Sequence, residues 1–462
     1  MVRVKCSFVL FLLWESFFIA ACQNNDNALT DYEPVEFRDS TLVRIEEEIT
    51  PDLTIHEGYV SQHEETIRIM RNGEAVALVK LGEPIMVAQA EDVQKWGYFQ
   101  FPQIFRVEDE ILIIRWNMMA DSHTSYGNGL YGRLMSKDKG QTWDYLDKEY
   151  TDRERSRVEY ENGEILQVYN PTSKDINQYE EFPCSVNSEP ITNYSFYIEE
   201  LLPEELKGIY FTHISEAGVP RRFHGYLYDP GYLRYAIGGL MPMVWRGDIK
   251  KTNGYLVAGV SPAYYLNKKG EVLKSAVTFY KSSDEGIHWT MIGKIPYQVK
   301  DENYEINIFD GTDGFLEPTF EILNDGSYLC VMRTGDRSPM YLSYSYDMGL
   351  NWSLPKPFTP NGVRPKLLLL KNGVLVLSSG RPGLQLRVSL DGDGRKWTEP
   401  IEMFHFFTDD GELDTWGSSG YPSVLEVNES TFFVVYDNFR VQNNEGKSRK
   451  SIYIREISII KK

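Results

Sequence analysis

The sequence contains few cysteines and no recognisable metal-binding spacing. Its 462 residues include four cysteines, and two of them lie within the first 22 positions. Of the other two, Cys330 lies inside a strand-like pattern, which favours a buried free thiol over a disulfide with Cys184. No paired-cysteine or paired-histidine motif occurs, so we expect no metal and no cofactor.

The sequence also lacks long basic runs and helical periodicity. Its net charge is −19, which repels phosphate backbones, so we expect no nucleic-acid partner. The hydrophobic content of 42% is ample for a large core and excludes global disorder. The only helix-like stretch is a possible short turn at 203–207. We therefore expect one all-β domain.

The first 22 residues are typical of an export signal. Arg3 and Lys5 precede an apolar stretch at 6–18, which is too short and too interrupted for a comfortable membrane span. The segment Ile19–Cys22 matches the lipobox of bacterial lipoproteins, in which the cysteine carries the lipid; an ordinary signal peptide cut after Ala21 is the alternative. We expect residues 1–22 to be a lipoprotein signal peptide and residues 23–50 a polar tether. The protein would be exported and lipid-anchored to the bacterial membrane, on its periplasmic or cell-surface face.

A short Ser-x-Asp-x-Gly-x-x-Trp element recurs along the chain. Complete copies occupy 136–143, 282–289 and 345–352, and a copy with one inserted residue occupies 389–397. Each copy follows a strand-like stretch, and the element itself predicts a tight turn closed by a tryptophan. Four copies in similar surroundings indicate a repeated structural unit.

A hairpin pattern precedes most copies. Pre-proline residues begin several of these hairpins, namely Phe101, Met241, Glu317, Arg364 and Tyr421. Turn pairs follow at 109–110, 253–254, 325–326, 372–373 and 428–429, and a sixth turn at 162–163 has no such proline.

Six hairpin units predict a six-bladed β-propeller over residues 51–462, with seven blades as the alternative. The stretch 55–79 is expected to supply a strand that closes the ring against 451–460. Residues 171–230 contain no clear box and are interpreted as an insertion or a degenerate blade.

The repeat register points to a polar site on the propeller axis. Residues at equivalent positions of different blades converge there, and the second strands end on Arg115, Arg333, Arg381 and Asp437. Blades need apolar residues in their sheets, so charged residues at these matched ends favour an axial cavity. The alternative is that they pair with one another around the channel.

Tyr421 and Glu317 form the most informative combination. A tyrosine hydroxyl is a poor nucleophile near neutral pH because its usual pKa is about 10. A neighbouring carboxylate can accept its proton and so activate it. Arginines close by can bind a substrate carboxylate through two parallel hydrogen bonds.

The boxes resemble the Asp-box (BNR) repeats of the sialidase superfamily. The segment LEPTFEILNDGSYLCVMR is similar to the sialidase segment with the activating glutamate and a substrate-binding arginine, which implies those roles for Glu317 and Arg333. GYPSVLEVNESTFFVVYDN is similar to the segment with the nucleophilic tyrosine, which implies that role for Tyr421. The resemblance further implies that Arg381 is the third arginine of the sialidase triad.

Two positions depart from the sialidase pattern. Gln100 stands at the substrate-binding position where sialidases have the first arginine of the triad, so we expect it to contact the substrate, and Arg106, Arg115 or Arg364 are candidates to compensate. The acid/base aspartate of sialidases matches Asp121 only about four residues out of place, and His123 lies beside it. Either residue is a candidate proton donor, and Asp121 is equally explained as a loop-capping carboxylate.

These observations favour a monomeric, sialidase-like glycoside hydrolase that acts on a terminal anionic sugar of a glycan. A second hypothesis is a propeller rhamnosidase or polysaccharide lyase, in which His123, His213 and His224 would matter more than Glu317. A third is a non-catalytic glycan-binding propeller, for which the 30 tyrosines and nine tryptophans would supply stacking surfaces.

Overall fold

The computed structural model describes residues 44–47, 59–107, 110–122, 125, 129–146, 153–186, 194–297, 313–335, 338–406 and 416–462. The predicted signal peptide with Cys22, most of the predicted tether, and His123 lie outside the described residues. No helix in the described part of the chain is long and apolar enough to cross a membrane.

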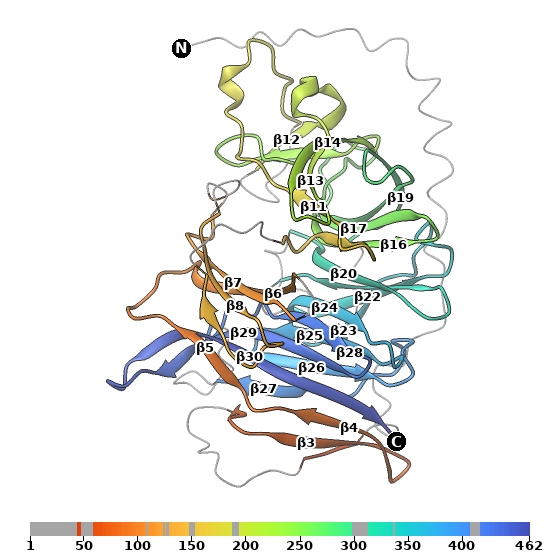
Figure 1. Cartoon of the computed structure of the whole chain (residues 1–462). Helices are drawn as coiled ribbons and strands as arrows, with labels where there is room; N and C mark the ends of the chain where they lie inside the picture. The colour runs from red at the N-terminus through yellow and green to blue at the C-terminus, as the bar shows by residue number, and fades with distance from the viewer. Residues whose placement is uncertain are drawn as a thin grey trace.

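The described strands form six antiparallel blades around an axis, as predicted (Figure 1). Blade 1 contains β6 (Tyr98–Arg106), β7 (Leu112–Met118), β8 (Tyr131–Ser136) and β9 (Asp144–Tyr145). Blade 2 contains β10 (Arg157–Glu159), β11 (Ile165–Tyr169), β13 (Ile209–Ile214) and β14 (Pro220–Tyr228). Blade 3 contains β16 (Arg246–Thr252), β17 (Tyr255–Ala263), β18 (Ala276–Ser282) and β19 (His288–Ile295).

The remaining blades follow the same order from the inner strand outward. Blade 4 contains β20 (Leu316–Ile322), β21 (Tyr328–Arg333), β22 (Met340–Ser345) and β23 (Lys356–Thr359). Blade 5 contains β24 (Val363–Leu369), β25 (Leu375–Gly380), β26 (Leu384–Ser389) and β27 (Ile401–His405), extended by β2 (Tyr59–Val60). Blade 6 contains β28 (Ser423–Asn428), β29 (Thr431–Gln442) and β30 (Ser448–Lys461).

N-terminal strands complete blade 6 and close the ring. Both β4 (Glu74–Leu81) and β5 (Ile85–Gln89) pair with β30, and β3 (Glu65–Arg71) and β1 (Arg44–Glu47) extend the sheet outward. The prediction that the stretch 55–79 supplies a strand that closes the ring is therefore confirmed by β4, and β5 is an additional closing strand.

The segment 171–230 is partly insertion and partly blade. The segment contains the short elements η2 (Ile176–Gln178), β12 (Ser195–Ile198), η3 (Glu199–Leu201) and η4 (Glu204–Leu206). A further short strand, β15 (Leu233–Ala236), follows it. The outer strands of blade 2, β13 and β14, come from the end of the same segment. β14 also pairs in parallel with β19, which joins blades 2 and 3 into one sheet.

The repeated box is a structural turn between the third and fourth strands of a blade. In 345–352, the Ser345 hydroxyl accepts a hydrogen bond from the Gly349 amide at 2.9 Å, and the Trp352 indole donates to the Gly349 carbonyl at 3.0 Å. Gly349 has a φ of 89°, which favours glycine there. The same two bonds recur in the other three copies, so each box fixes the turn between two strands of its own blade.

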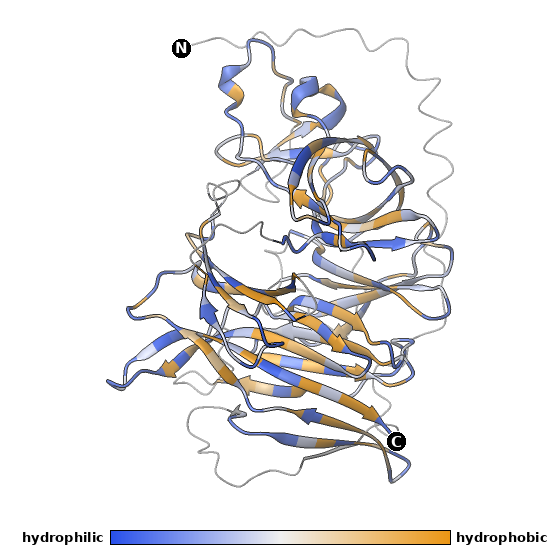
Figure 2. Ribbon diagram, viewed as in Figure 1, coloured by the Kyte–Doolittle hydropathy of each residue, from blue (hydrophilic) through white to orange (hydrophobic). Residues whose placement is uncertain are grey.

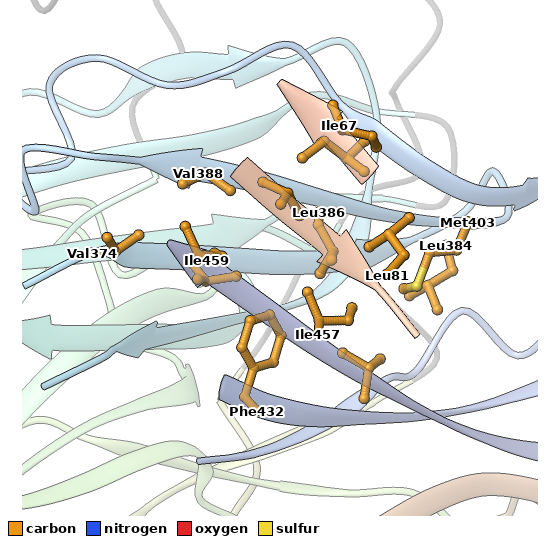
Figure 3. Packing of buried hydrophobic residues seen from close by; sticks show 14 of the residues in the cluster. Ile67, Leu81, Val374, Leu384, Leu386, Val388, Met403, Phe432, Ile457 and Ile459 are labelled. Carbon is orange, nitrogen blue, oxygen red and sulfur yellow. The ribbon is translucent and has the colours of Figure 1, made fainter. Parts of the chain in front are cut away.

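The core lies between neighbouring blades. Hydrophobic residues gather on the strands, whereas hydrophilic residues predominate in the connections (Figure 2). One cluster packs blade 5 against blade 6 and the closing strands, with Leu81, Val388 and Ile457 each at most 1% exposed (Figure 3). Cys330 is a free, buried cysteine inside β21, as predicted.

Candidate active site

Three inner strands contain a β-bulge at the pre-proline residue. The pairing register shifts across Phe101 in β6, Glu317 in β20 and Arg364 in β24. These residues have φ values of 55°, 46° and 47°, which non-glycine residues rarely adopt. Bulges change the direction of side chains and are frequent beside active sites, and strained backbone is retained where the surrounding structure enforces it.

Each of the six blades contributes one residue, in or just before its inner strand, to one cavity of about 600 Å³. These residues are Phe101, Arg155, Arg246, Glu317, Arg364 and Tyr421. The predicted convergence of equivalent positions on the axis therefore occurs, and it gathers three guanidinium groups, one carboxylate and one phenol.

Tyr421 and Glu317, which line this cavity, form a hydrogen-bonded cluster with Arg333, which lies outside its lining. The Tyr421 hydroxyl donates to Oε1 of Glu317 through a short hydrogen bond. Arg333 donates from Nη1 to Oε2 of Glu317 at 2.8 Å and to the Tyr421 oxygen at 2.9 Å. The three residues come from blades 6 and 4, and the sequence separates them by up to 104 positions.

The cluster keeps Glu317 ionised. Burial alone would raise the pKa of its carboxyl, but the charges of Arg333, Arg364 and Arg246 and the hydrogen bond from Tyr421 outweigh burial and hold the pKa well below its usual range. Burial and the adjacent carboxylate raise the pKa of Tyr421, although Arg333 opposes them. At rest the proton therefore stays on the phenol, beside a carboxylate that can accept it.

The segment before Tyr421 is held by Asp437, a buried carboxylate in β29. Its Oδ1 accepts from the Ser418 hydroxyl and the Ser419 amide, both at 2.7 Å. Its Oδ2 accepts from the Ser419 hydroxyl at 2.5 Å and from the Phe101 amide at 3.1 Å. The Asp437 side chain thus holds both the segment before Tyr421 and the backbone at Phe101 in place.

Two further predicted residues, Asp121 and Arg115, line the cavity. Asp121 is exposed and accepts a hydrogen bond from the Trp96 indole at 3.0 Å. Arg115 is buried, pairs with Glu154 at 3.2 Å, and lies 4.2 Å from the centre of the Tyr131 ring. Arg115 is therefore neutralised by a partner, whereas Asp121 is open to a ligand.

Two predicted substrate contacts are placed differently. Gln100 is fully buried, does not line the cavity, and accepts a hydrogen bond from the Gly97 amide, so its prediction as a substrate contact is wrong. The bulge in β6 directs Phe101, not Gln100, to the axis. Arg381 is also outside the lining; it donates to the Ser419 carbonyl at 3.2 Å and stacks on Trp416 at 4.8 Å.

The sequence prediction missed Arg155 and Arg246. It took Met241 as the start of a blade, but β16 begins at Arg246, and blade 2 has no pre-proline residue at all. Met241 lies before the inner strand, although its side chain still lines the cavity. Counting back seven residues from the turn asparagines Asn162 and Asn253 gives Arg155 and Arg246, so the turns contained the signal.

Two histidines of the second hypothesis, His213 and His224, lie outside the cavity. His213 pairs with Glu164 at 3.5 Å, and His224 contacts the Lys207 carbonyl. Neither lines the cavity that contains Tyr421. Among the described residues there is no group of three or more His, Cys, Asp or Glu side chains placed to hold a metal ion.

Comparisons with known proteins agree with this architecture. Residues 243–434 match a family model described as a BNR repeat-like domain. The chain is similar to a solved protein of unknown function from Dyadobacter fermentans, with 16% identity and a TM-score of 0.55 over 82% of this chain and 99% of that one. No curated protein matches the sequence.

Weaker structural similarities are found with two glycosidases. The Hadza microbial sialidase Hz136 is 15% identical, with a TM-score of 0.46 over 89% of this chain and 74% of that one. An α-L-arabinofuranosidase from Fusarium graminearum is 12% identical, with a TM-score of 0.41 over 77% and 92%. The protein is thus an all-β propeller, and residues 243–434 of it match a BNR repeat-like domain.

Proposed function

We propose that this protein is a glycoside hydrolase that removes a terminal, anionic sugar from a glycan. The observation that carries the proposal is the hydrogen-bonded pair of Tyr421 and Glu317 in a cavity lined by several guanidinium groups. Arg333 donates to the carboxylate of this pair and to its phenolic oxygen. Tyrosine nucleophiles are known among glycosidases. The segment Ile19–Cys22 further supports export and attachment to a membrane through a lipid.

In the proposed reaction Tyr421 attacks the anomeric carbon while its proton passes to Glu317. Because the pKa values of the two groups lie far apart at rest, proton transfer accompanies bond formation and does not precede it. Arg333 lies 2.9 Å from the phenolic oxygen and stabilises the negative charge that develops there as the proton leaves. Asp121 gives its proton to the leaving oxygen. Water then attacks the anomeric carbon and loses a proton to Asp121, while the glycosyl–tyrosine bond breaks and Glu317 returns its proton to the Tyr421 oxygen.

The anionic character of the sugar follows from the cavity wall. Arg155 and Arg364 add two positive charges to the wall, whereas Glu317 and Glu154 are already paired with Arg333 and Arg115 and Asp121 is the remaining carboxylate of the lining. A neutral sugar would leave this excess charge without a partner.

The test is hydrolysis of aryl glycosides of sialic acid, uronic acids and rhamnose by the purified protein. Tyr421→Phe should reduce kcat/KM on the acidic substrate by about 100-fold or more, because it removes the nucleophile but keeps the ring. Tyr346→Phe, at an exposed position in blade 4, is the matched control and should change little. Hydrolysis that is indifferent to Tyr421→Phe would contradict the mechanism, and no hydrolysis of any substrate would favour a glycan-binding propeller.

A further inference from the structure

Two exposed tryptophans lie side by side outside the lining of the catalytic cavity. Trp96, which precedes β6 of blade 1, and Trp416, which precedes β28 of blade 6, have exposed fractions of 37% and 50%. Their ring centres are 5.3 Å apart, and the ring planes make an angle of 76°. Apolar residues scattered singly over a surface are common, whereas two large rings in contact form a continuous apolar area. We refer to these two residues as the tryptophan pair.

A series of ring contacts connects the tryptophan pair to the proposed nucleophile. The ring centres of Trp96 and Phe101 are 6.0 Å apart, and those of Phe101 and Tyr421 are 5.0 Å apart. Phe101 and Tyr421 line the catalytic cavity. The tryptophan pair therefore continues the aromatic part of the cavity wall outward to exposed surface.

Arg381 stacks on both indole rings. Its guanidinium carbon lies 4.8 Å from the centre of the Trp416 ring and 5.5 Å from that of the Trp96 ring. Arg381 is 5% exposed, and its Nε donates to the Ser419 carbonyl at 3.2 Å. A cation fixed against two rings orients them before a ligand arrives, which reduces the ordering cost of binding. The resemblance to sialidases implies a substrate-binding role for Arg381, whereas these contacts favour a supporting role.

The tryptophan pair lies on the side of the cavity that receives the leaving group. Trp96 donates from its indole N–H to Oδ2 of Asp121 at 3.0 Å. Asp121 lines the cavity, and in the proposed reaction it gives its proton to the leaving oxygen. The sugar that carries this oxygen therefore lies next to Asp121, and from there its ring extends over the tryptophan pair.

We propose that the tryptophan pair is a leaving-group subsite, which binds the neutral pyranose ring to which the anionic sugar is attached. A pyranose ring has a face made of C–H groups, and this face packs against an indole while the hydroxyl groups stay in water. Arg381 is buried, so the subsite presents apolar area and not charge to its ligand. This inference rests on the proposed function and adds the second sugar of its substrate.

The first experiment measures binding of neutral disaccharides, which the proposed reaction does not cleave. The parent protein is titrated with lactose, cellobiose and N,N′-diacetylchitobiose by isothermal titration calorimetry. At least one of the three should bind. Trp416→Ala should weaken that binding by about 3- to 10-fold, because it removes one ring of the pair. Trp416→Phe keeps a smaller ring and should retain more of the affinity than Trp416→Ala.

Tyr228→Ala is the matched control, because Tyr228 is an aromatic residue of β14 that is 67% exposed and outside the cavity lining. It should bind the disaccharide as the parent does. Arg381→Met should weaken binding because the rings lose the cation that orients them, and Arg381→Lys should lose less. An Arg381 that contacted only the anionic sugar would leave the neutral disaccharide unaffected. Thermal unfolding checks that each variant is folded, and Trp416→Ala decides if Arg381→Met does not fold.

The second experiment measures kinetics with the anionic sugar that the aryl glycosides identify. For each protein, kcat/KM on the glycoside of the bound disaccharide is divided by kcat/KM on the methyl glycoside. This ratio should fall by about 3- to 10-fold in Trp416→Ala and stay at the parent value in Tyr228→Ala. The division cancels any effect of a substitution that both substrates share.

Four outcomes would overturn the subsite. They are no binding of any disaccharide by the parent, equal binding by the parent and Trp416→Ala, an equal loss in Tyr228→Ala, and self-association that Trp416→Ala abolishes, which would assign the pair to an interface between copies. If binding depends on Trp416 but the parent hydrolyses no glycoside, the pair is a glycan-binding surface and the hydrolase mechanism is wrong. If hydrolysis depends on Tyr421 but neither binding nor the ratio depends on Trp416, only the subsite is wrong.

Discussion

Two buried carboxylates in this molecule respond to their surroundings in opposite ways. Glu317 has arginine partners, which hold its pKa below the usual range in spite of burial. Asp229 accepts hydrogen bonds from the hydroxyls of Tyr265 at 2.7 Å and Tyr280 at 2.6 Å. Burial dominates there and raises the pKa of Asp229 from 3.8 to about 6, although Lys294 and the two tyrosines act against it. Neutral donors thus compensate burial less well than a guanidinium does.

Asp229 should make the stability of the protein depend on pH. Because its folded pKa lies above the unfolded value, its contribution is fully present below pH 4 and is lost as pH rises through about 6. The raised pKa corresponds to about 3 kcal/mol. Asp229→Asn removes the titration, so the unfolding free energy of the variant minus that of the parent should rise by up to about 3 kcal/mol between pH 4 and pH 7.

Urea denaturation at several pH values measures this difference, and subtraction cancels the titration of all other groups. A difference that stays constant across the range would show that Asp229 titrates normally. The substitution keeps an oxygen that can accept from one tyrosine, so the variant should still fold.

At the scale of strands and loops, Asp437 couples β29 to the segment that presents the proposed nucleophile. In the parent, Oδ2 of Asp437 accepts hydrogen bonds from the Ser419 hydroxyl and the Phe101 amide. Asp437→Asn replaces this oxygen by an NH2 group, so donors would face donors. The segment before Tyr421 should shift, which affects the transition state more than substrate binding. We expect kcat to fall by about ten-fold or more while KM changes less than about three-fold.

The same kinetics on Asp391→Asn, which removes an exposed ion pair with Arg71, should match the parent. Ser419→Ala should have a smaller effect than Asp437→Asn, because the Ser419 amide still donates to the carboxylate. A change in KM alone, with kcat preserved, would mean that Asp437 does not position Tyr421.

Local elements of this fold were predictable, and pairings between distant strands were not. The four boxes and the hairpin turns depend on Ser, Asp, Gly and Trp at short spacing, so the sequence reveals them directly. The parallel pairing of β14 with β19 joins Tyr226 to His288 across 62 positions, and no turn residue encodes it. Register failed in blades 2 and 3, where no proline follows the axial residue, and for this reason Arg155 and Arg246 were missed.

The sequence predicted those parts of the site that follow from residue type and strand register. Tyr421, Glu317 and Arg333 meet as expected, because their register positions in blades 4 and 6 were correct. The pairing of Arg115 with Glu154 and the stacking of Arg381 on Trp416 depend on side-chain packing, which a register cannot give. Their roles and that of Asp121 remain predictions.

At the scale of the whole molecule, the ring depends on a seam between the two ends of the described chain. β4 pairs with β30 from Ala77–Lys461 to Leu81–Ile457, and the terminal strand of the chain thereby lies between β29 and β4. Propellers protect their blade edges by such closure. β29 carries Asp437, so the seam and the candidate site share one sheet.

Leu81→Ala tests the energetic weight of this seam. Leu81 is 1% exposed and packs between β30 and blade 5 (Figure 3), so truncation should lower the unfolding free energy by about 2–5 kcal/mol. Leu78→Ala is the matched control, because Leu78 lies half-buried on the opposite face of the same strand and should cost less. Urea denaturation followed by tryptophan fluorescence measures both variants. Equal losses would show that the seam is held by backbone pairing alone, and a separate early transition in Leu81→Ala would show that the ring can open at blade 6 while the other blades stay folded.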